Sequence, residues 1–137
     1  MRKAIILLIF SACASSQNEA LNKQSIELHE AAMQVGKQIS EKIGELEALQ
    51  DSSLMDSVIA LKQGYEAWEE SVVEVPGHEH DHHDHDHEGH DHDHDHSPSP
   101  DLTPEMVLEI QTELKANAEV LNQRADRILE MVKSDNQ

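Results

Sequence analysis

Apolar residues recur at intervals of three and four along most of the chain, and this spacing constrains the fold more than any other feature. The first stripe starts at Leu21 and covers roughly 30 residues, close to the 3.5-residue repeat of a coiled coil. It predicts one helix about 45 Å long. Ser25 and Lys42 interrupt the stripe, and Ile26 and Ile43 beside them are expected to be buried instead. The stripe comprises Leu21, Leu28, Ala32, Val35, Ile39, Leu46 and Leu49.

A second stripe follows a break at residues 51–53. Ser53 with Asp56 has the spacing of a capping box, which predicts that a helix begins there. Pro76 and Gly77 end the pattern, because proline cannot continue the hydrogen-bond ladder and glycine favours a turn. The stripe comprises Leu54, Val58, Leu61, Tyr65, Trp68, Val72 and Val75.

A third stripe begins with clear signals for a helix start. Thr103 is a suitable N-cap, Pro104 suits the first helical position, and Glu105 favours the positive end of the helix dipole. Leu102 is expected to pack on Val107 as a hydrophobic staple. The stripe comprises Val107, Ile110, Leu114, Leu121, Ile128 and Met131, and is interrupted by Asn117 and Arg124 beside Ala118 and Ala125.

Three helical stripes with no strand pattern predict an all-α fold, an antiparallel three-helix bundle of coiled-coil type. The first two stripes form a helical hairpin over residues 20–75, the third helix covers 104–133, and 134–137 are a tail. Tyr65 and Trp68 are expected in the core, whereas His29 is expected at the solvent edge of the first stripe. The stripes also leave open self-association as a coiled coil, which would make a homo-oligomer.

Residues 76–103, between the second and third stripes, contain no apolar pattern. A connection of this length without regular structure is usually functional or disordered, and we expect disorder here. Within it, residues 78–96 hold ten of the chain's eleven histidines, and eight of the other nine residues are Asp or Glu. We call residues 78–96 the histidine strip. The Ser-Pro repeat at 97–100 after it is a stiff, non-helical spacer.

The histidine strip has the composition of a metal site. Neutral imidazole is a common ligand for Zn²⁺, and it also suits Ni²⁺, Co²⁺ and Cu²⁺, while carboxylates attract a dication. With three or four ligands per tetrahedral ion, the strip could hold roughly two to three zinc ions. The candidate ligands are His78, His80, His82, His83, His85, His87, His90, His92, His94 and His96, with Asp81, Asp84, Asp86, Asp91, Asp93 and Asp95 as auxiliary ligands.

The strip contains no cysteine and no long fixed ligand spacing, so we expect exchangeable sites that buffer, capture or deliver metal. Two other interpretations stay open. The strip could be a solvated linker between helices that bind a protein partner. It could also sense pH, since its charge changes from about −8 towards about +2 below a pH of roughly 6.5. No arrangement of catalytic residues is visible, and an enzyme is not expected.

The first residues read as a short secretory signal, because a basic start at Arg2 and Lys3 precedes an apolar run at residues 4–10. That run is too short to cross a bilayer. Without the two signal residues, the chain has 28 acidic and 8 basic residues, a formal charge of −20. Nucleic acid and anionic lipid surfaces would repel such a chain, and cations are the more natural ligands.

Phe10-Ser11-Ala12-Cys13 resembles the lipobox of bacterial lipoproteins, in which Leu usually stands where Phe10 stands here. The resemblance implies that residues 1–12 are removed as the signal and that Cys13 carries covalent lipid. Residues 13–19 would then be a flexible tether. Ala14 lacks the Asp that retains some lipoproteins at the inner membrane, which favours the outer membrane facing the periplasm. An ordinary signal with a chance cysteine is the alternative.

The histidine strip is similar to the His/Asp-rich loops of periplasmic zinc-binding proteins and cation transporters. This resemblance covers residues 78–96 alone. It implies the collection of metal in the cell envelope, and a metal transporter or another envelope protein as partner.

Overall fold

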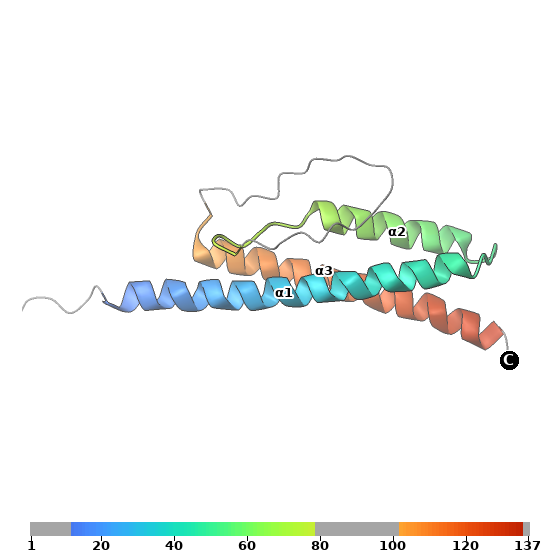
Figure 1. Cartoon of the computed structure of the whole chain (residues 1–137), viewed down its shortest axis with the longest axis horizontal. Coiled ribbons are helices and arrows are strands. Elements are labelled where there is room, and N and C mark those ends of the chain that lie inside the picture. The colour runs from blue at the N-terminus through green and yellow to red at the C-terminus, as the bar shows by residue number, and fades with distance from the viewer. Residues whose placement is uncertain (1–11, 79–101, 136–137) are drawn as a thin grey trace, which may run out of the picture.

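The computed structural model describes residues 12–78 and 102–135, which form three helices and no strand. They are α1 (Ala12–Ala48), α2 (Met55–Glu70) and α3 (Pro104–Asp135). Figure 1 shows α2 running opposite to both α1 and α3, along one part of that longer pair. The prediction of an all-α fold is confirmed. Residues 1–11 of the predicted signal, residues 79–101 with most of the strip, and residues 136–137 lie outside the described part of the chain.

Side-chain contacts between α1 and α3 show that these two helices run parallel. His29 Nδ1 lies 2.9 Å from Gln111 Oε1, 82 positions along the chain. Three to four helical turns further on, Lys42 Nζ donates to Asn122 Oδ1 at 2.8 Å, 80 positions along. Parallel helices keep such a separation nearly constant, as it is here.

The seam of α1 follows the predicted spacing but lies partly on a different row of residues. Predicted seam residues Leu28 and Val35 are only half-buried, and Leu49 is exposed. The row that is buried takes in polar and small residues instead, because α2 and α3 pack over them. It comprises Ser25, His29, Ala32, Gly36, Ile39, Ile43 and Leu46.

The seam of α3 departs from the prediction in the same way. Ile110 is half-buried and Met131 is exposed, whereas the neighbouring Gln111 is fully buried. As expected, Ala118 and Ala125 take the buried places beside the polar interruptions. A 3.5-residue repeat is compatible with two adjacent rows of buried residues. Because we chose the more hydrophobic residues, we predicted the wrong row at these positions.

Trp68 of α2 fills the space between the two long helices. Its ring lies so close to Gly36 that a Cβ there would stand 2.5 Å from the ring atom Cη2. The indole Nε1 donates to the Leu114 carbonyl oxygen at 3.0 Å. Tyr65 stacks on the indole with ring centroids 5.8 Å apart. Trp68 therefore contacts all three helices at once.

The second helix ends at Glu70, five residues before the predicted end. Ser71 Oγ donates to the Trp68 carbonyl oxygen at 2.7 Å, and beyond it the chain is no longer helical. Val75 precedes Pro76, a position that disfavours the helical conformation. Val72 and Val75 are nevertheless buried, so the chain still packs against the bundle after the helix has ended. We call residues 72–78 the stem, because the histidine strip begins at its end.

The predicted capping box at the start of α2 is wrong. Ser53 donates backward to Asp51 Oδ1, from its backbone N at 2.8 Å and from its Oγ at 2.7 Å. These two hydrogen bonds lower the pKa of the exposed Asp51 carboxyl. The helix starts at Met55, and no side chain caps it.

The start of α3 is as predicted, but α1 begins earlier than expected. Thr103 Oγ1 accepts from the Met106 backbone N at 3.3 Å, and Pro104 is the first helical residue. The first helix starts at Ala12, so residues 13–19 belong to α1, where we expected a flexible tether. No glycine or proline interrupts these residues, and nothing in their composition stops a helix.

Replacing Gly36 with Ala is expected to lower the free energy of unfolding by about 1–3 kcal/mol, because the added methyl group would overlap the Trp68 ring. Gly44→Ala in the same helix is the matched control. A Cβ at position 44 meets no atom within 4 Å, and this variant should be more stable by about 0.5–1 kcal/mol. Urea unfolding followed by circular dichroism measures both. Equal effects of the two substitutions would contradict this packing.

Candidate metal-binding site

Of the predicted metal ligands, the structure describes His78 alone. The other nine histidines and the six auxiliary aspartates lie outside the described residues, so their role stays a prediction. Within residues 12–78 and 102–135, no group of three or more His, Cys, Asp or Glu side chains could hold a metal ion. Cys13 lies in the first turn of α1.

A tight turn at the end of the stem orients His78. Its backbone N donates to the Val75 carbonyl oxygen at 3.0 Å, and Gly77 between them has a φ of 78°. Only glycine adopts this left-handed conformation without strain. The turn places His78 Nε2 3.5 Å from Glu30 Oε1 on α1, with a quarter of the histidine side chain exposed. The first ligand of the strip therefore stands on the surface of α1.

The chain leaves the bundle and returns to it at the same place. Pro76 from the stem and Leu102, just before α3, line one shallow hollow with Asn22 of α1 and Val107 of α3. A connection between neighbouring points needs only a few residues, whereas residues 79–101 could extend for about 75 Å. The span to be bridged therefore does not require the length of the histidine strip.

His29 is fully buried, and the prediction that it lies at the solvent edge is wrong. It occupies a seam position of α1 and faces Gln111, which is equally buried on α3. Gln111 Nε2 donates to the Val73 carbonyl oxygen of the stem at 2.7 Å. The other imidazole nitrogen, Nε2, lies 3.5 Å from Glu74 Oε2. A chain of polar groups thus joins α1, α3 and the stem beneath the start of the strip.

The sequence did carry a signal for this buried cluster. His29 stands four residues after Ser25 and three before Ala32, and Gln111 stands four after Val107 and three before Leu114. Two polar residues at equivalent seam positions can form a buried hydrogen-bonded pair, as polar residues do at single core positions of coiled coils. We missed the pair because Leu28 and Ile110 are more hydrophobic neighbours.

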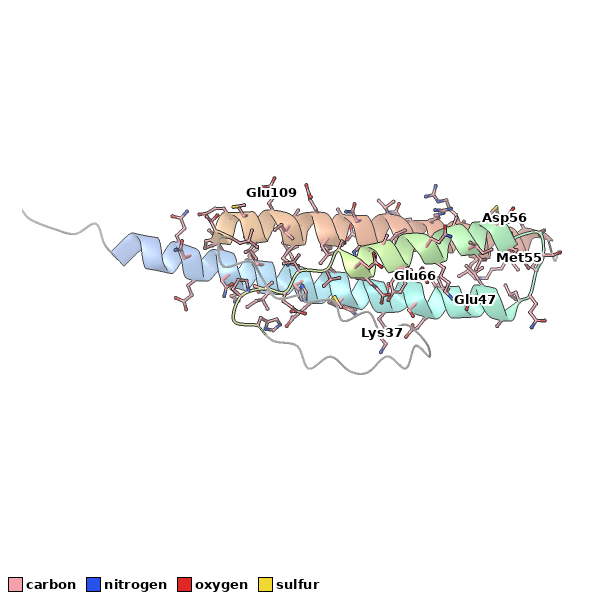
Figure 2. All side chains as sticks on the ribbon, turned by 90° about the horizontal axis from the view of Figure 1, so that it is seen from above. Lys37, Glu47, Met55, Asp56, Glu66 and Glu109 are labelled. Carbon is pink, nitrogen blue, oxygen red and sulfur yellow. The ribbon has the colours of Figure 1, made fainter. Side chains whose placement is uncertain are left out.

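Tyr65 and Trp68 are core residues, as predicted. Burial raises the pKa of the Tyr65 phenol well above its ordinary value, and the nearby Glu69 adds to this effect. The phenol therefore stays neutral and serves packing. Charged side chains lie outside this core, and Figure 2 shows Lys37 and Glu109 pointing away from the bundle on opposite sides.

Comparison with protein-family models, with curated proteins and with solved structures found no match. Among the helices that the structure describes, none is long and apolar enough to cross a membrane.

Proposed function

We propose that this protein is a lipid-anchored envelope protein that binds divalent transition metal, zinc first, through the histidine strip. Its task is to buffer, capture or deliver that metal. The observation that carries the proposal is the density of ligands, ten histidines alternating with eight carboxylates over residues 78–96. Imidazole supplies the ligand atoms, and the carboxylates attract the cation.

The position of the strip in the fold supports the same function. Pro76 and Leu102 meet at one hollow, so a much shorter connection would join α2 to α3. A long insertion that the fold does not need is more readily explained by its composition than by its span. A solvated linker would not need ten histidines.

The first helix would act as a rigid spacer between the anchor and the strip. Cys13 and Glu30 are both in α1, and Glu30 contacts His78. At 1.5 Å per residue, the start of the strip stands about 25 Å along the helix from the lipidated cysteine. That distance would hold the strip clear of the lipid headgroups, where it can exchange metal with the surroundings or with a transporter.

A structural or interaction protein is the second candidate, with the strip as a linker or pH sensor. The observation in its favour is exposed apolar surface near the α1–α2 turn. There Leu49, Met55 and Ile59 are each about half exposed, and Met55 is labelled in Figure 2. Partner binding by the helices would survive deletion of the strip, whereas metal capacity would not.

Zinc titration of the full chain by calorimetry tests the main proposal. At pH 7 we expect roughly two to three ions per chain with micromolar or tighter affinity, and loss of binding at pH 5.5, because protonated imidazole cannot bind metal. Replacing the ten strip histidines with Asn should abolish binding. The matched control, His29→Gln, should bind as the wild type does. Millimolar binding, or binding that survives in the Asn variant, would contradict the proposal.

If Cys13 carries the lipid anchor, membrane attachment should depend on this residue alone. In a bacterial host, the wild type should incorporate labelled palmitate and sediment with membranes. Cys13→Ser should lose the label and the sedimentation, because no second cysteine exists to carry lipid. Ser15→Ala, two residues away, is the control and should behave as the wild type. Membrane attachment of Cys13→Ser would contradict a lipid anchor.

A further inference from the structure

One face of α3 points away from both other helices. Met106, Val120 and Met131 lie on it, with 47%, 60% and 46% of their surface exposed. They share one side of the helix, because residues 106 and 120 are about four turns apart and residues 120 and 131 about three turns. Glu109 belongs to the same side and points away from the bundle in Figure 2. We call this side, over residues 106–131, the outer face of α3.

The charges on the outer face are separated along the helix. Glu109 and Glu113 lie in its first half, Arg124 and Arg127 lie in its second half, and all four are exposed. Like charges three or four residues apart on a helix repel each other. Arg127 Nε donates to the Gln123 carbonyl oxygen at 3.2 Å, but among the described residues no ion pair joins any of the four to an opposite charge. The outer face therefore offers one acidic half and one basic half to a partner.

We propose that a second copy of this chain packs on the outer face of α3, with the two α3 helices antiparallel. Such a pair has a twofold axis, so every contact between the copies occurs twice. With the axis midway between residues 118 and 119, Met106 of one copy lies opposite Met131 of the other. The same axis places Glu113 opposite Arg124, and these opposite charges attract each other.

The other residues of the outer face fit the same axis. Glu109 stands within one residue of the position opposite Arg127, close enough for two long side chains to pair. At the centre, Val120 of each copy comes beside Ala116 of the other, whose small side chain lets the two helices approach closely. A parallel pair would instead set Glu109 and Glu113 against the same glutamates of the second copy, and these like charges repel each other. The charge pattern therefore selects the antiparallel pair.

This local complementarity has to overcome the overall charge of the chain. A net charge of −18 makes two copies repel each other in general. The contact also involves one helix of about 38 Å from each copy, which is small for a stable interface. We therefore expect a dimer that dissociates at micromolar concentrations, in which the ion pairs decide whether the copies associate.

The dimer does not rest on the proposed function. Because α1 and α3 run parallel, the antiparallel pair places the two Cys13 residues at opposite ends. Two copies anchored by lipid in one membrane would then lie along its surface, and α1 would act as a spacer in the monomer alone. Zinc binding by the strip and association through α3 can each fail while the other stands.

Sedimentation equilibrium of the full chain tests the dimer, at pH 7 with EDTA present so that metal cannot link the histidine strips. The wild type should pass from monomer to dimer as its concentration rises through the micromolar range. Replacing both Arg124 and Arg127 with Glu makes the outer face acidic throughout, and should raise the dissociation constant by about tenfold or more. Lys23→Glu with Lys37→Glu, the same change of charge on exposed sites of α1, should leave the dimer nearly unchanged. A wild type that stays monomeric up to millimolar concentration would overturn the proposal.

Mixing two variants separates the contact from a folding defect. Glu109→Arg with Glu113→Arg makes the outer face basic throughout, and this variant should also be monomeric by itself. Mixed in equal amounts with the acidic variant, it should form a heterodimer at least as tight as the wild-type dimer, because opposite charges then meet along the whole face. Circular dichroism should show the wild-type helix content for each variant, because all the substituted residues are exposed. Variants that self-associate as the wild type does, or a mixture that stays monomeric, would overturn the antiparallel contact.

Discussion

The relative placement of the three helices depends on the contact between Trp68 and Gly36. The indole is the largest side chain in the core, and it fits between α1 and α3 only because position 36 has no side chain. Its hydrogen bond to the Leu114 carbonyl oxygen ties the same ring to α3. One residue of the short helix α2 therefore sets the distances from α2 to both long helices. Apart from Tyr65, the rest of the core is made of smaller aliphatic side chains, which bury apolar area but do not fix the positions of the helices.

Two polar layers set the register of α1 against α3. One is the buried pair of His29 and Gln111. The other is nearer the surface, where Lys42 donates to Asn122 and forms an ion pair with Asp126. A buried polar group costs free energy unless its partner is in place, so a slipped register would leave these groups unpaired. Apolar residues recurring every 3.5 positions cannot supply that discrimination, because each register of such a stripe buries a similar area.

Much of the fold could be predicted from the sequence, because amphipathic period and helix start signals are local. All seven residues predicted for the second stripe are buried or half-buried, and Thr103 begins α3 as expected. The errors arise where contacts with residues distant in the sequence determine which positions are buried and where a helix ends. Gly36 belongs to the seam only because Trp68 needs the space. The helix end at Glu70 was missed because Val72 and Val75 remain buried in a non-helical stem, where they continue the pattern of the helix.

For the candidate site, the ligand chemistry stays a prediction from composition, since alternating imidazole and carboxylate need no particular fold to attract a cation. The surroundings of the strip could not be predicted from the sequence. Nothing local indicates that the two ends of the connection meet beside Asn22, or that the stem passes over a buried histidine. These features come from the antiparallel return of α2, which brings residue 73 to Gln111 of the third helix.

The proposed function requires that the helices fold without metal and that the histidine strip carries metal as cargo. Amide NMR spectra of the full chain at pH 7, recorded with and without zinc, test it most directly. We expect zinc to shift the signals of residues 78–96 and to leave those of the α1 and α3 seams unchanged. Shifts throughout the helices, or helix content that rises only when zinc is added, would contradict it. The metal would then be part of the fold, as in structural zinc domains.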